Sequence, residues 1–84
     1  MKCLKLNAKN TKSASKAMVE LSELGLTRIG GVSDQLCVVF WSDGDYCGVS
    51  NHETEPSVLA ESTEFFTKRK EFISAVKRVL GESK

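Results

Sequence analysis

The chain has 84 residues, of which 40% are hydrophobic and 27% are charged, and its formal net charge is only +1. This composition excludes wholesale disorder and predicts a single small globular domain over residues 1–84. No apolar run approaches the roughly 18 to 20 residues that a bilayer crossing needs, and the first residues lack the apolar region of a signal peptide. We therefore expect a cytoplasmic protein that does not bind membranes.

The small net charge hides three segments of opposite sign. Residues 1–28 carry six basic side chains against two acidic ones, and residues 68–84 do the same, so each has a net charge of +4. Residues 29–67 carry seven acidic side chains and no Lys or Arg, a net charge of −7. Such segregation predicts two faces of opposite potential, which affects the choice of partners and the rate of association.

The cysteine and carboxylate patterns give no metal site. The three cysteines form no Cys-x-x-Cys pair; they are Cys3, Cys37 and Cys47. We predict reduced, buried thiols without a disulfide framework or a zinc site. The acidic turn at residues 43–45 begins like a calcium loop, but Thr54 stands where the twelfth-position Glu is required. We therefore expect neither metal nor cofactor.

The N-terminal third predicts a strand, a helix and a second strand. Leu4 and Leu6 alternate with polar positions and predict a strand. A helix follows, with Ser13 as its N-cap and Gly25 in the left-handed C′ position, and its apolar stripe is Ala14, Ala17, Met18, Leu21 and Leu24. Residues 26–32 then predict a short strand, with a bulge or turn at its two consecutive glycines.

The clearest local pattern is a hairpin. Residues 36–41 and 46–50 are rich in β-prone side chains, and Asp43-Gly44 between them favours a type I′ turn.

This turn would fix the hairpin register. A two-residue loop pairs Trp41 with Tyr46 and Phe40 with Cys47. In that register Cys37 and Cys47 point to opposite sides of the sheet, so a bond between them is not expected.

The C-terminal part predicts a long connection and a final helix. Residues 51–62 contain the only Pro and the only His, with room for a short strand at residues 58–60. The helix begins near Ser62 or Thr63 and closes at Gly81, and its apolar face is Phe65, Phe72, Ile73, Val76, Val79 and Leu80. The order β-α-β-β-β-α predicts an α+β, two-layer fold: an antiparallel sheet of three to four strands with two helices packed on one face.

Catalysis has no positive support in the sequence. His52 has Glu53 and Glu55 nearby, but residues on one loop have no geometric basis as a catalytic group. The glycine pair at residues 30–31 lacks the spacing and the Lys of a phosphate-binding loop. We therefore expect no enzyme, and an uncharacterised enzyme is only the third hypothesis.

The first hypothesis is a small non-enzymatic protein-interaction domain of regulatory or inhibitory type. An acidic sheet and hairpin face with exposed aromatics would bind a basic protein surface or a second copy of the chain. The residues of this surface are Trp41, Tyr46, Asp43, Asp45, Glu53 and Glu55. The acidic segment could also imitate the charge of a nucleic acid and occupy the groove of a protein that binds one.

The alternative hypothesis is nucleic-acid binding. The basic N-terminal segment and the C-terminal helix, with Lys68, Arg69 and Lys70, would form one basic surface if the two ends of the chain lie together. The acidic hairpin argues against it, because that segment would repel phosphates beside Trp41. A solvated helix face is the simpler explanation of the basic run.

Overall fold

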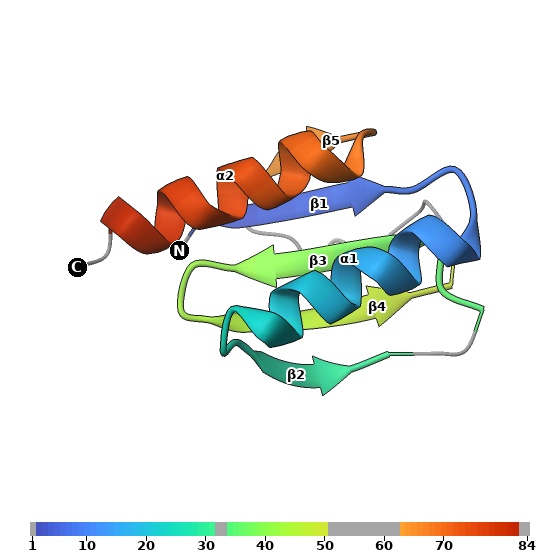
Figure 1. Ribbon diagram of the computed structural model, residues 1–84, viewed down its shortest axis with the longest axis horizontal. Helices are drawn as coiled ribbons and strands as arrows, with labels where there is room; N and C mark the ends of the chain where they lie inside the picture. The colour runs from blue at the N-terminus through green and yellow to red at the C-terminus, as the bar shows by residue number, and fades with distance from the viewer. Residues whose placement is uncertain (1, 32–33, 51–62, 83–84) are drawn as a thin grey trace.

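The computed structural model describes residues 2–31, 34–50 and 63–82, which form one sheet and two helices (Figure 1). In chain order the elements are β1 (Cys3–Asn7), α1 (Thr11–Glu23), β2 (Thr27–Gly30), β3 (Cys37–Trp41), β4 (Asp45–Val49), β5 (Glu64–Phe66) and α2 (Arg69–Glu82). The α+β class predicted from the sequence is confirmed.

The sheet is mixed, and in the described residues it has five strands in the order β2-β4-β3-β1-β5. β3 is antiparallel to both β1 and β4, but β1 runs parallel to β5 and β2 runs parallel to β4. The predicted antiparallel sheet of three to four strands is therefore wrong in detail. One cause is α1, which carries the chain back over the sheet so that β2 runs in the same direction as β1 (Figure 1).

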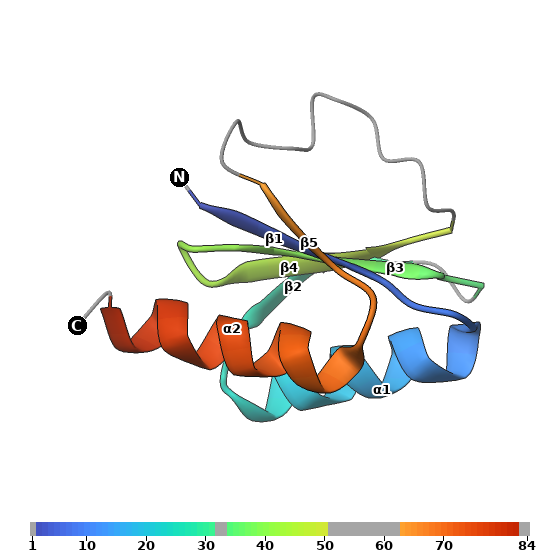
Figure 2. The same cartoon turned by 90° about the horizontal axis from the view of Figure 1, so that it is seen from above.

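Both helices cover the same face of the sheet (Figure 2). The main core lies between these two layers, and its largest fully buried side chains are Leu4, Leu6, Leu21, Val38, Phe40, Phe72 and Val76. Neither helix of the described residues is both long enough and apolar enough to cross a membrane.

Helix α1 begins earlier than predicted. Its N-cap is Asn10, whose Oδ1 accepts a hydrogen bond from the backbone N–H of Ser13 at 2.8 Å, so Ser13 is not the cap. The C-terminal prediction is confirmed: Gly25 has a φ of +82°, and the N–H of Leu26 donates to the carbonyl of Leu21 at 3.4 Å. This is the hydrogen-bond pattern of a Schellman ending, which satisfies carbonyls that the helix itself cannot pair.

The C-terminal helix begins later than predicted, because Glu64–Phe66 forms strand β5 along the outer edge of β1. Pairing with β1 gives these residues backbone partners that a helix would otherwise provide. Phe65 is consequently 58% exposed, whereas the sequence placed it in the core. Helix α2 then starts at Arg69 and continues through Gly81 to Glu82, so Gly81 does not close it. The predicted start at Ser62 and the strand at residues 58–60 lie outside the described residues.

The β3–β4 hairpin has a register one residue away from the predicted one. Phe40 pairs with Tyr46, and Val39 pairs with Cys47. The N–H of Gly44 donates to the carbonyl of Trp41 at 2.9 Å, and Gly44 alone in this turn has a positive φ, +103°. The turn is therefore a three-residue loop with a left-handed glycine, not the predicted type I′ turn, which needs two positive φ values.

The register also changes which cysteines share a face. Cys37 and Cys47 lie on the face away from the helices, so their predicted separation is wrong. Cys3, Val39 and Cys47 form a small buried cluster there. All three cysteines of the chain are buried and none forms a disulfide, and burial raises the pKa of Cys37 and Cys47.

Candidate functional site

The two aromatic residues of the predicted interaction surface lie on opposite faces of the sheet. Tyr46 is only 3% exposed and belongs to the core under the helices, whereas Trp41 is half-buried on the other face. The predicted cross-strand pair of Trp41 and Tyr46 is therefore wrong. Side chains alternate along a strand, so a change of one residue in register moves every side chain of β4 to the opposite face.

The acidic part of that surface is only partly described. Asp43 is exposed at the β3–β4 turn, and its Oδ1 accepts a hydrogen bond from the N–H of Asp45 at 3.1 Å. Glu53 and Glu55 lie outside the described residues. A partner-binding role for this surface stays a prediction.

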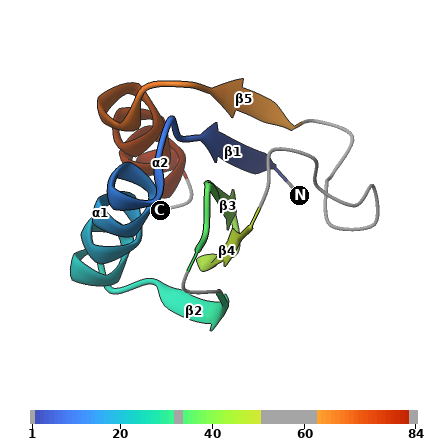
Figure 3. The ribbon, with the colours of Figure 1, turned by 90° about the vertical axis from the view of Figure 1, so that its right-hand side faces the viewer.

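A second set of residues meets at the opposite end of the molecule, where β1 and β5 end and both helices begin (Figures 1 and 3). Because β1 and β5 are parallel neighbours, their carboxyl ends lie together at one edge of the sheet. We call the open depression there the basic groove. Its volume is about 1130 Å³, and it is lined by Asn7, Ala8, Lys9, Asn10, Lys12, Ser13, Lys16, Thr67, Lys68, Arg69, Lys70 and Glu71.

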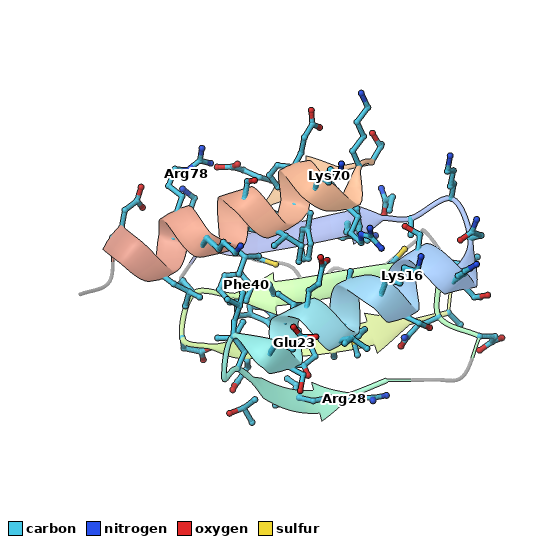
Figure 4. All side chains as sticks on the ribbon, viewed as in Figure 1. Lys16, Glu23, Arg28, Phe40, Lys70 and Arg78 are labelled. Carbon is cyan, nitrogen blue, oxygen red and sulfur yellow. The ribbon has the colours of Figure 1, made fainter. Side chains whose placement is uncertain are left out.

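The charge of the basic groove is strongly positive. Six of the twelve Lys and Arg residues of the chain line it, and Glu71 is the single acidic residue in its lining. Both helices contribute basic side chains to the groove, for example Lys16 on α1 and Lys70 on α2 (Figure 4).

The two helix starts add to this positive potential. Each helix N-terminus carries a partial positive charge from its unpaired N–H groups. The first turn of α1 contains no acidic residue, and its cap, Asn10, is neutral. No negative charge in this turn therefore offsets the partial positive charge of the helix start. The first turn of α2 contains Glu71.

One cation of the basic groove is already paired. The Nε of Arg69 lies 3.6 Å from Oε2 of Glu20, which joins the start of α2 to the middle of α1. That carboxylate oxygen is inaccessible to solvent and has no hydrogen-bond partner at shorter range. A carboxylate oxygen of Glu20 therefore lies next to Arg69, in a place that an oxygen of a phosphate could also take.

The structure divides the N-terminal lysines that the sequence grouped together. Lys9, Lys12 and Lys16 join the predicted Lys68, Arg69 and Lys70 in the basic groove. Lys2 instead pairs with Glu64 at 3.5 Å near the start of β1. Lys5 is 2% exposed on the face away from the helices, with its Nζ 5.9 Å from the centre of the Phe65 ring.

Strand β5 is the feature that sequence reasoning missed. It places the start of α2 against α1, and so decides which lysines meet. Glu64, Phe65 and Phe66 do not alternate between polar and apolar side chains, and three residues are too few to separate a strand from a helix start.

The described part of the chain offers no cluster of metal ligands. Within residues 2–31, 34–50 and 63–82 no three His, Cys, Asp or Glu side chains gather as a metal site requires. His52 lies outside those ranges. Comparison with protein-family models, with curated proteins and with solved structures gives no match.

Proposed function

We propose that this chain is a non-enzymatic domain that binds nucleic acid by holding its phosphates in the basic groove. The observation that carries the proposal is the convergence of six cations, from two segments far apart in the sequence, on one open groove. Nucleic-acid backbones present regularly spaced negative charges that such a cluster can neutralise. The proposal keeps the cytoplasmic location expected from the sequence.

The local electrostatics support an anionic ligand. The six like charges of the groove repel one another, and Glu20 beside Arg69 and Glu71 in the lining offset only part of this repulsion. Phosphate oxygens accept hydrogen bonds from Lys, Arg and helix-terminal N–H groups, so a phosphate chain in the groove would relieve that repulsion. The lysines stand on flexible stems, which suits contact with a backbone of variable shape.

The salt dependence of binding tests this proposal. We would titrate the protein into a fluorescein-labelled duplex of about 20 base pairs and measure anisotropy between about 50 and 200 mM salt. Lys16→Gln and Lys70→Gln should each reduce the slope of log K against log salt by about 0.9, because each removes one phosphate contact.

Lys77→Gln is the matched control for Lys70→Gln. Lys77 is exposed on the same face of α2, two turns further on and about 10 Å away along the helix axis, and it does not line the basic groove. Its replacement removes the same charge and should leave the slope nearly unchanged. Absence of binding at about 50 mM salt, or an equal loss of slope in both variants, would contradict the proposal.

Binding of a basic protein is the second candidate. It is favoured by Trp41, which stays half-buried at the β3–β4 hairpin beside exposed Asp43, although Tyr46 cannot contribute. With oligolysine as the probe, Trp41→Ala should weaken binding if this surface is used, whereas Lys70→Gln should not. Unchanged binding in Trp41→Ala would remove this candidate.

A further inference from the structure

We infer that the nucleic acid held in the basic groove is a duplex, and that the groove contacts its two backbones and not its bases. This inference rests on the proposed function and names the form of its ligand. Three features of the groove support it: the absence of aromatic side chains from its lining, the arrangement of its cations in two rows, and the lack of groups suited to reading base edges.

The lining of the basic groove offers no surface on which bases could stack. None of the described residues that line it is aromatic. Of the two nearest aromatic side chains in sequence, Phe72 is buried in the core, and Phe66 contacts it edge to face at 6.0 Å. Phe66 is partly buried and lines a separate depression on the α2 side of Lys70. Trp41 lies at the hairpin end of the molecule, and Phe65 lies beside Lys5 on the other face of the sheet. Single-strand binding sites usually combine cations with stacking platforms, and only the cations are present here.

The cations of the basic groove come from two segments, which we call its two rows, although Lys68, Arg69 and Lys70 are consecutive and so do not share one side of α2. Lys9, Lys12 and Lys16 precede or lie on α1, and Lys68, Arg69 and Lys70 lie at the start of α2. Lys12 and Lys16 are four residues apart and therefore share one side of α1. The two helices are neighbours in the same layer (Figure 3).

Cations on two neighbouring helices suit two phosphate strands. Lys12 and Lys16 lie on α1 and Lys70 lies on α2, so the groove carries positive charge on both of its helices. Each row can therefore meet the phosphates on one side of a duplex groove. A single strand would place its phosphates along one row and leave the other unused.

The polar groups of the lining are poorly suited to reading bases. The Oδ1 of Asn10 caps α1, and Arg69 is paired with Glu20. The other cations are lysines, which act as point charges, whereas bidentate Arg and amide groups are the usual readers of base edges. Binding should therefore depend little on base sequence.

Competing forms of one oligonucleotide test the inference. We would compare a labelled DNA strand, the same strand annealed to its complement, the equivalent RNA duplex, and a second DNA duplex of unrelated sequence, all at about 0.1 M salt. Because Arg69 is paired with Glu20, five cations remain for the ligand, and five contacts with slopes of about −0.9 per contact on a duplex and −0.7 on a single strand differ about tenfold in affinity at that salt. We expect both DNA duplexes to bind at least tenfold more tightly than the strand, and within about threefold of each other.

Variants from the two rows extend the test. Lys12→Gln and Lys70→Gln should each lower the duplex slope by about 0.9, and the double variant by about twice as much, because the rows contact different strands. Trp41→Ala should change neither form. The RNA arm decides which duplex is preferred: comparable binding of both duplexes supports recognition of paired backbones in general, and tight binding of one duplex alone supports recognition of that duplex geometry.

The outcomes separate this inference from the proposed function. Salt-dependent binding in which the single strand is within tenfold of both duplexes overturns the duplex inference and leaves the proposed function standing. A preference of more than about tenfold between the two DNA sequences overturns the backbone-only reading. No salt-dependent binding of any form overturns both the inference and the proposed function.

Discussion

Replacing Glu20 by Gln should strengthen nucleic-acid binding, because Glu20 holds a cation that a phosphate would otherwise contact. The Nε of Arg69 lies 3.6 Å from Oε2 of Glu20, and the two side chains are 28% and 43% exposed. Arg69 lines the basic groove, so its ion pair with Glu20 competes directly with the ligand.

The size of the effect follows from one additional phosphate contact. Releasing Arg69 should steepen the dependence of log K on log salt by about 0.9, which corresponds to about eightfold tighter binding at about 0.1 M salt. The fold should lose little, because a partly exposed ion pair contributes only about 0.2 to 1 kcal/mol to the free energy of unfolding.

Glu23→Gln provides the control for the loss of a negative charge alone. Glu23 is exposed on the last turn of α1, one turn beyond Glu20 and further from the basic groove. Anisotropy titrations with a labelled duplex across several salt concentrations would measure the slope for both variants, and thermal melts would confirm that both fold. An equal change of slope in Glu20→Gln and Glu23→Gln would refute the competition. Weaker binding in Glu20→Gln would mean that Glu20 positions Arg69 for the ligand.

Three further predictions concern the fold. Gly44→Val should lower the free energy of unfolding by about 1 to 3 kcal/mol, since φ is +103° there, and an unchanged urea midpoint would contradict the three-residue loop. Phe72→Ala should lower the free energy of unfolding by about 3 to 5 kcal/mol because the Phe72 ring is fully buried, whereas Phe65→Ala should lower it by less than about 1 kcal/mol. Equal losses for the two variants in chemical denaturation would disprove strand β5. Burial raises the pKa of Cys37 and Cys47, so their thiol forms stabilise the fold below about pH 9 and that stability is lost as the pH rises further. Urea melts at about pH 7.5 and pH 10 should show this loss, and it should be smaller in the double Ala variant.

Features governed by neighbouring residues could be predicted from the sequence. Four residues of the predicted stripe, Ala14, Ala17, Met18 and Leu21, are buried, whereas the fifth, Leu24, is 36% exposed at the C-cap. Gly25 follows the end of α1 with a positive φ, as expected. In both cases the signal and the structure that it specifies lie within one or two helical turns.

The register of the β3–β4 hairpin could not be predicted from the residues of the hairpin alone. Asp43-Gly44 is compatible both with a two-residue loop and with a three-residue loop in which only Gly44 is left-handed. Packing decides between them, because the second register buries Tyr46 under the helices and puts Cys47 on the other face. The faces on which Trp41 and Tyr46 lie could therefore not be predicted from neighbouring residues alone.

The basic groove could not be predicted from the sequence, because it depends on a contact between distant parts of the chain. The sequence singled out Lys68, Arg69 and Lys70, but it could not show which N-terminal lysines would join them. That choice is made by the parallel pairing of β5 with β1, which brings Leu4 opposite Glu64 and Leu6 opposite Phe66. A pairing across almost 60 residues leaves no periodic signal in either segment.

Two carboxylates of the acidic segment, Asp43 and Asp45, argue less strongly against nucleic-acid binding in three dimensions than they did in the sequence. Asp43 and Asp45 lie at the hairpin end of the molecule, and the basic groove lies at the other end of its long axis (Figure 1). That axis is 33 Å long, whereas charges are screened over about 8 Å at physiological ionic strength. A phosphate in the groove would therefore experience the local cluster of cations far more strongly than these two carboxylates. Asp34 is nearer, because it lies two residues before Leu36, whose carbonyl accepts a hydrogen bond from the N–H of Ala8 in the groove lining, and Glu53, Glu55 and Glu61 lie outside the described residues. The net charge of +1 is thus a poor guide to the potential at this site, because it averages over charges at different distances from the groove.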